Sequence, residues 1–193
     1  MLPVTVETTL VRDGRRIRVA DATISTDQGV IGRASAVLLR TSEQPGGEQT
    51  IVTPAWDEPQ PDGPPVEGAG WRPPFDLWRL TGWGEPGPGR VWLRETHPLV
   101  DDEPVSPFVR TALAADFASP LSNNASDGLR FINADYTLTL ARLPGSELIG
   151  VEATGHVSAG GVATGQVTLH DTAGPIGFCL VTAVANAVAI GGR

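Results

Sequence analysis

A turn-and-strand signature occurs twice in this chain, and the repetition constrains the fold more than any other feature. The pattern Gly-x-Ile-Gly begins at Gly29 and again at Gly174, each time at the start of a strand-like run. The two glycines lie 145 positions apart, and the same offset places Arg15 on Gly160. Such self-similarity indicates two copies of one supersecondary unit. We therefore expect the two halves to correspond strand for strand.

The first copy is predicted as a three-stranded meander over residues 4–40. Its β-branched runs are separated by the turn sequences Asp13-Gly14 and Asp27-Gln28-Gly29, which favour tight reversals. The residues that should share one face of the first and third strands are Val4, Val6, Thr8 and Leu10, with Gly32, Ala34, Ala36 and Leu38. Alternation of this kind predicts a sheet with one apolar face.

The second copy is predicted from four strand-like runs that follow a helix. The runs are Phe131–Arg142, Glu147–Ser158, Val162–His170 and Pro175–Asn186, and Gly and Pro residues punctuate them. The helix should begin after Ser106, whose hydroxyl can cap free amides, with Pro107 at the first helical position. Pro120 should end it, so the prediction is a helix over 107–119. Two more strands are expected before it, at Asp76–Thr81 and Arg90–Glu95.

Residues 41–74 contain mostly Pro, Gly and acidic side chains and predict a connector without regular structure. Its Trp56 and Trp71 indicate that it packs across a surface. The expected organisation is therefore a partial first copy over 1–40, the connector over 41–74, and a complete second copy over 75–193.

The first copy contains no counterpart of the helix that precedes the second meander. An uncovered apolar face costs about 25 cal/mol per Å², so something is expected to cover it. One hypothesis is that Met1 is an internal methionine and that the natural chain starts roughly half a domain earlier. The other is that a second subunit or the connector fills the gap. A homo-oligomer is accordingly expected.

Composition excludes several classes of partner. The net charge is −8, and the basic run Arg12, Arg15, Arg16 and Arg18 is too short to predict binding to a nucleic acid. No segment reaches the roughly 20 apolar residues that span a bilayer, and the start lacks a signal peptide, which favours the cytoplasm. The dispersed residues His97, His156 and His170 do not predict a metal site. We expect no cofactor, and we expect Cys179 to be a buried core side chain.

Several linked segments resemble the two-domain acyl-CoA thioesterases that are common in actinobacteria. They are Val6-Glu7-Thr8, Arg12-Asp13-Gly14-Arg15-Arg16, the segment from Ala34 to Arg40, Ser106-Pro107, Ala114-Ala115-Asp116-Phe117, and Phe131 to Thr137. The resemblance implies an α+β double hot-dog fold, in which antiparallel sheets wrap around a central helix. It also implies hydrolysis of an acyl-CoA thioester to a free acid and CoA.

The same resemblance implies three residues that hold the attacking water. An Asp at the start of the strand after the second helix matches Asp135. A Thr or Ser on the next strand falls near Thr154, with Gly155 and His156 adjacent. A Gln on the last strand falls near Val181, with Thr182 beside it, so the amide is missing. Losing a positioned donor costs about two to three orders of magnitude in rate, so weak or absent activity is expected unless Thr182 or a backbone amide substitutes.

Other interpretations remain open. Asp135 could serve only to satisfy backbone donors at a strand start, and Thr154 could be an ordinary strand residue. The whole chain could be a non-catalytic acyl-CoA-binding or assembly module on the same scaffold, which the apolar Val181 favours. A dehydratase or hydratase would need a histidine at the helix or its loop, and residues 106–128 contain none.

Overall fold

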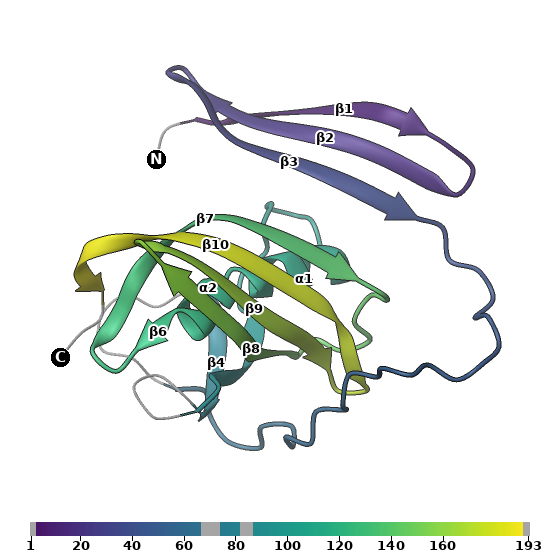
Figure 1. Cartoon of the computed structure of the whole chain (residues 1–193). Helices are drawn as coiled ribbons and strands as arrows, with labels where there is room; N and C mark the ends of the chain where they lie inside the picture. The colour runs from purple at the N-terminus through teal and green to yellow at the C-terminus, as the bar shows by residue number, and fades with distance from the viewer. Residues whose placement is uncertain (1–2, 67–73, 82–86, 191–193) are drawn as a thin grey trace. The chain divides into compact units, whose positions relative to one another are not determined.

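The computed structural model describes residues 3–66, 74–81 and 87–190 and divides into two compact units, Met1–Ile51 and Val52–Arg193. The first unit is an antiparallel sheet in the order β1 (Thr5–Asp13), β2 (Ile17–Thr26), β3 (Gly29–Leu39). The predicted three-stranded meander over residues 4–40 is thus confirmed. Figure 1 shows β1, β2 and β3 as three consecutive arrows, and the breaks between them, residues 14–16 and 27–28, fall at the predicted turn sequences.

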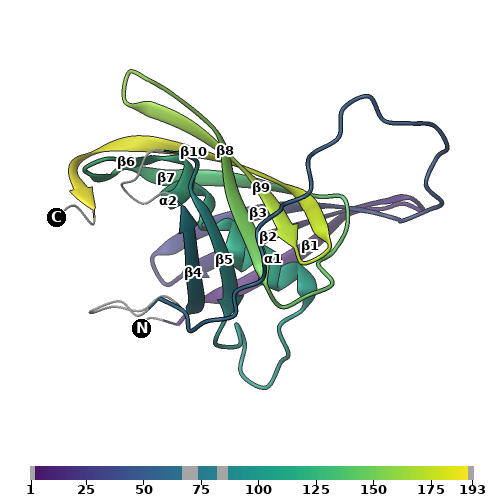
Figure 2. The same cartoon turned by 90° about the horizontal axis from the view of Figure 1, so that it is seen from below.

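The second unit is a seven-stranded antiparallel sheet in the order β4-β5-β8-β9-β10-β7-β6. Its strands are β4 (Phe75–Thr81), β5 (Arg90–Glu95), β6 (Asn124–Ala125), β7 (Gly128–Leu140), β8 (Ile149–Ala159), β9 (Val162–Asp171) and β10 (Gly174–Ile190). Six of these seven strands match predicted runs, whereas no predicted run covers the two-residue β6. The sheet curves over α1 (Pro107–Ala115) and α2 (Ala118–Ser122), as Figures 1 and 2 show from two sides.

The helical segment starts where the sequence predicts but is divided. The Ser106 hydroxyl accepts a hydrogen bond from the Val109 amide at 3.2 Å, and Pro107 occupies the first turn. The prediction of one helix over 107–119 was wrong in its second half, because α1 ends at Ala115 and α2 continues to Ser122. Pro120 does not end the helix, since it lies in the first turn of α2, where a missing amide costs nothing.

We predict that Ser106→Ala lowers the free energy of unfolding by about 1 kcal/mol, because it removes the only side-chain acceptor of the first turn of α1 among the described residues. Urea denaturation measures the change. Ser106→Asp should keep most of the stability, because a carboxylate caps the same amides. An equal loss in both variants would contradict the capping role.

The core lies between the helices and the concave face of the second sheet. Alternate residues of β10 are buried there, among them Cys179, Val181 and Ala183. Cys179 is thus a core side chain, as predicted. A Cβ at Gly165 would overlap the Ser122 side chain, so this glycine lets α2 approach the sheet closely.

The internal repeat is confirmed at the level of strand register. Every pairing of β2 with β3, from Ala20↔Ala36 to Thr26↔Gly29, recurs in β9 and β10 at the offset of 145. The bulge near the turn recurs as well, and so does a turn hydrogen bond: Thr26 Oγ1 accepts from the Gln28 amide, and Asp171 Oδ1 accepts from the Ala173 amide. The two meanders are therefore the same structure built twice.

The correspondence identifies the face of the first sheet that is equivalent to the helix-packing face of the second sheet. Ala34, Ala36 and Leu38 match Cys179, Val181 and Ala183, three buried residues on the core side of β10. Large apolar side chains on this face of the first unit are exposed, including Val6 and Leu38. The requirement for a cover, and with it the expected homo-oligomer, stays a prediction.

The connector packs on the outer surface of the second unit, as its tryptophan predicted. The Trp56 ring lies against Gly150 and stacks on Trp92 and His170, at centroid distances of 4.5 and 4.8 Å. The Trp92 indole donates to the Pro59 carbonyl at 2.9 Å. Trp71 lies outside the described residues.

Charged side chains surround the Trp56 contact. Arg90 bridges Glu58 of the connector and Glu152 of β8, and Glu152 also contacts His170. Burial lowers the pKa of His170, although Glu152 opposes that change. The connector is thus attached to the sheet by apolar and ionic contacts together.

Candidate active site

Asp135 and Thr182 are direct cross-strand partners. Asp135 lies on β7 and Thr182 on β10, and the strand register pairs them. Both side chains are exposed on the sheet face opposite the helices, since the flanking Val181 and Ala183 are buried in the core. Cross-strand neighbours have Cβ atoms about 4.5–5.5 Å apart, so one water molecule can contact both polar groups.

A β-bulge sets the orientation of Asp135. The pairing of β7 with β10 shifts between Thr182 and Ala183, where Ala134 is the extra residue. On one side of the bulge the Asn133 amide donates to Asp116 at the end of α1, at 3.4 Å. On the other side Asp135 points away from the helices. The bulge therefore places the Asn133 side chain on the helix side of the sheet and the Asp135 carboxylate on the opposite side. Bulges next to functional sites often redirect side chains in this way.

Thr154 is not adjacent to the Asp135–Thr182 pair. It lies on β8 at a second bulge, and its hydroxyl donates to the Gln166 carbonyl at 3.4 Å. Two strands, β9 and β10, lie between β8 and β7. At about 4.8 Å per strand, Thr154 is about 14 Å from the Asp135 strand. The chain therefore brings two of the three predicted site residues together and leaves the third apart.

Two polar residues next to the pair were missed at the sequence level. Thr164 on β9 is the other cross-strand partner of Thr182, and Gln166 pairs with Leu180 one step along the sheet. Both belong to the outward-facing set of β9, because the alternate residues Ala163, Gly165 and Val167 are buried. Alternation within the predicted strand Val162–His170 would have identified them. An amide is thus present beside the site, on a different strand from the expected one.

The Cys179 thiol on the helix-side face is not poised as a nucleophile. Burial raises the pKa of the Cys179 thiol to about 12, and Asp116 and Asp135 add to the effect. A thiol with that pKa stays protonated at neutral pH. Burial also raises the pKa of Tyr136. Cys179 therefore acts as a packing residue.

The three histidines lie apart. His156 contacts the Asn123 side chain at 2.9 Å, whereas His170 lies under Trp56. His97 contacts the neighbouring Thr96. Within the ranges that the structure describes, no group of three or more His, Cys, Asp or Glu side chains could hold a metal ion, and no helix is long and apolar enough to cross a membrane.

Comparison with known families decides the assignment. Residues 50–184 match the model of the acyl-CoA thioesterase C-terminal domain, which is more than half of the chain. The chain belongs to this family. The matched range contains the helices, Asp135 and Thr182, so the candidate site lies on the part of the chain that the family defines. No curated protein matches the sequence.

Solved structures of similar fold extend the match to the first unit. The TesB protein of Mycobacterium avium subsp. paratuberculosis aligns with a TM-score of 0.65 at 17% identity, over 95% of this chain and 72% of that one. A putative thioesterase II from Thermobifida fusca aligns at 0.70 and 16%, over 95% and 72%. A hot-dog protein of unknown function from Alicyclobacillus acidocaldarius aligns at 0.70 and 16%, over 95% and 73%. The acyl-CoA thioesterase family member described here thus has the predicted hot-dog fold.

Proposed function

We propose that this chain hydrolyses an acyl-CoA thioester, with Asp135 as the base that activates water and Thr182 as the side chain that helps to hold it. The observation that supports the proposal is the direct pairing of Asp135 with Thr182 on the exposed sheet face. Membership of the thioesterase family supports the substrate class. We also propose a cytoplasmic location, because acyl-CoA is an intracellular thioester.

The chemistry requires one proton transfer in each direction. Asp135 accepts a proton from water as the oxygen attacks the thioester carbonyl carbon. The tetrahedral intermediate then expels the CoA sulfur, which takes the proton back from Asp135. Thr182 can donate a hydrogen bond to the developing oxyanion or orient the water, whereas an ionised carboxylate can only accept. Because Thr182 stands beside the position where relatives place Gln, we expect slow turnover.

Replacing Asp135 by Asn is expected to lower turnover by about 100-fold, because the amide cannot accept the proton. Thiol release from a panel of acyl-CoA substrates of increasing chain length measures the rate. The exposed Asp127→Asn is a matched control that should leave the rate unchanged. Turnover that survives Asp135→Asn would remove Asp135 from the mechanism.

The companion variant Thr182→Gln tests the second residue. It places an amide donor beside Asp135 and should raise turnover by about tenfold or more, since a positioned donor contributes at least that much to oxyanion stabilisation. Thr182→Val should lower it. Equal rates in all three proteins would show that position 182 takes no part.

A non-catalytic acyl-CoA-binding or assembly module is the second candidate. The observation that favours it is the burial of Val181 in the core, which leaves Thr182 as the only side chain at this point of β10 that can contact a substrate on the outer face. Calorimetry that detects acyl-CoA binding while no thiol is released, in wild type and in Thr182→Gln alike, would favour this candidate over the hydrolase.

A further inference from the structure

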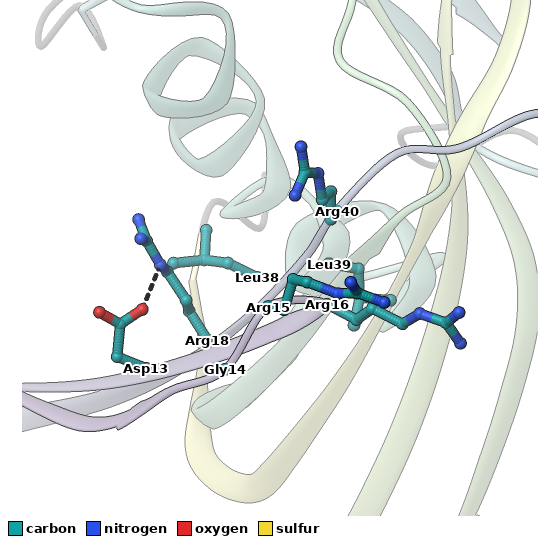
Figure 3. A pocket seen from close by; sticks show the side chains of 8 residues that line it. All are labelled: Asp13, Gly14, Arg15, Arg16, Arg18, Leu38, Leu39 and Arg40. Carbon is teal, nitrogen blue, oxygen red and sulfur yellow. Dashed lines mark hydrogen bonds and ion pairs between the residues drawn. The ribbon is translucent and has the colours of Figure 1, made fainter.

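A basic cavity lies in the first unit, at the hairpin between β1 and β2. Its lining comes from the turn and from the end of β3, and the cavity measures about 600 Å³. The lining residues are Asp13, Gly14, Arg15, Arg16, Arg18, Leu38, Leu39 and Arg40. Figure 3 shows the four arginine side chains around it, with Asp13 paired to Arg18 at one side. Its volume falls in the range of about 300–1,000 Å³ that is typical of small-molecule sites.

Three of these arginines have no carboxylate partner in the described part of the chain. They are Arg15, Arg16 and Arg40, and they also line an adjoining hollow with Thr41 and Ser42. In the second unit, by contrast, five arginines each form an ion pair: Arg90, Arg94, Arg110, Arg130 and Arg142. In a chain of net charge −8, such a concentration of unpaired positive charge favours the binding of an anion.

The second copy of the repeat shows that the arginines are not needed to pair these strands. Arg15 and Arg16 correspond to Gly160 and Gly161, and Arg40 corresponds to Ala185. The strands pair in the same register in both copies, and the Arg40 amide donates to the Arg16 carbonyl at 2.9 Å as the Ala185 amide donates to the Gly161 carbonyl at 2.8 Å. The turns themselves differ, because Gly160 and Gly161 have positive φ angles and Arg15 and Arg16 do not. One copy makes this strand pairing with small uncharged residues and the other with three cations, so the pairing does not require the cations.

Guanidinium groups suit one ligand chemistry above others. Their planar forks bind phosphate oxygens in bidentate fashion, and the hydroxyls of Thr41 and Ser42 add donors at the rim. Leu38 and Leu39 give the same cavity an apolar wall. This combination fits a compact phosphorylated group with an apolar part better than it fits an extended polyanion.

We propose that this cavity binds the nucleotide end of CoA, with Arg15, Arg16 and Arg40 on its phosphate groups. The inference rests on the proposed function for its choice of ligand, because an acyl-CoA is the substrate with several phosphates that the family implies. It assigns a binding role to the first unit, which lies almost wholly outside the matched family range.

Isothermal calorimetry with CoA, dephospho-CoA and pantetheine tests the proposal. Wild type should bind CoA more tightly than dephospho-CoA, and dephospho-CoA more tightly than pantetheine. The triple variant Arg15→Gln/Arg16→Gln/Arg40→Gln should weaken CoA binding by roughly 10- to 100-fold and leave pantetheine binding unchanged. Arg33→Gln, which removes another arginine of the same sheet outside the cavity, is the matched control and should change CoA affinity by less than about twofold.

Salt dependence provides a further readout. CoA binding by wild type should weaken with rising salt more steeply than binding by the triple variant, because the variant has fewer charge contacts for the salt to screen.

The outcomes separate this site from the proposed hydrolase. CoA binding that depends on the three arginines, in a protein without measurable turnover, would refute the hydrolase and keep the nucleotide site. Turnover that depends on Asp135, with equal CoA affinity in wild type and triple variant, would overturn the nucleotide site alone. Equal affinity of wild type for CoA and pantetheine would overturn it as well. Circular dichroism spectra and melting curves of each variant ensure that only folded proteins are compared.

Discussion

Replacing Trp56 by alanine is expected to lower the free energy of unfolding by about 2–4 kcal/mol. The indole fills the space above Gly150 and packs on Trp92 and His170, so its removal leaves a hollow on the outer face of the sheet. The contact also attaches the connector to the sheet. Urea denaturation should report the loss of stability, and limited proteolysis should cut the connector faster in the variant.

A second variant tests the same contact from the opposite side. Gly150→Ala places a methyl group where the Trp56 ring lies, so it should displace the ring and produce a comparable loss. Val52→Ala changes an exposed residue of the connector and should have little effect. If Trp56→Ala unfolds at the wild-type urea concentration, the connector does not contribute to the stability of the second unit.

The variant should also alter how stability depends on pH. Burial holds the pKa of His170 below its unfolded value, so the unfolded chain binds more protons and wild type loses stability as the pH falls below about 6.5. Without Trp56, water reaches the imidazole and its pKa rises toward the ordinary value. The loss of stability between pH 7 and pH 5 should therefore be smaller in Trp56→Ala.

Asp171→Ala is expected to cost about 3–4 kcal/mol at pH 7. The carboxylate is fully buried and accepts hydrogen bonds from the Arg142 guanidinium at 2.6 Å and from the amides of Gly145 and Ala173 at 2.8 Å. Removing it leaves the two amides without this acceptor, and Arg142 keeps the Gly174 carbonyl as an acceptor, at 3.0 Å. Asp127→Ala is the control, because it removes an exposed carboxylate that is paired with Arg130. This variant should unfold at the wild-type urea midpoint. The comparison therefore shows whether the cost of Asp171→Ala comes from the buried contacts or from the loss of a negative charge.

Acid should reduce the difference between wild type and Asp171→Ala. Arg142 and the two amides hold the pKa of Asp171 well below its ordinary value. Its contribution to stability is therefore complete above about pH 3.9 and is lost as the pH falls toward the folded pKa. Urea midpoints of the two proteins, measured from pH 7 down to pH 2.5, should converge only below about pH 4. A constant difference over that range would contradict the assignment.

Most of the strand framework could be predicted because turn chemistry and alternation act locally. Asp13-Gly14, Gly160-Gly161 and Gly174 specify reversals whatever lies around them, and the repeat fixed which strands correspond. The division between α1 and α2 could not be predicted, because it depends on how closely the sheet lets each helical segment approach. Pro120 predicted the end of the helix, but a proline is equally suited to the first turn of a following helix, which is where it lies.

The candidate site was only partly predictable for a similar reason. Asp135 and Thr182 are 47 positions apart in sequence and lie on adjacent strands of the sheet. The resemblance pointed to Asp135 directly and to Thr182 only as the neighbour of Val181, and the role of both residues stays a prediction. The bulges at Ala134 and Thr154 shift side chains between faces by one residue, which counting along the sequence cannot detect. Alternation could have placed Gln166 on the outer face of its strand, but its position opposite Leu180, beside the Asp135–Thr182 pair, depends on pairing between strands.

The position of β10 has a consequence for synthesis of the chain. This strand lies between β7 and β9 and pairs with both, and it follows the other six strands of the sheet in sequence, so the sheet lacks an interior strand until β10 has been synthesised. Until then the helices and the earlier strands stay partly folded, with apolar surface uncovered. Such exposed surface makes a partly folded chain prone to aggregation. Loss of β10 would thus prevent closure of the whole layer, and expression should depend strongly on an intact β10.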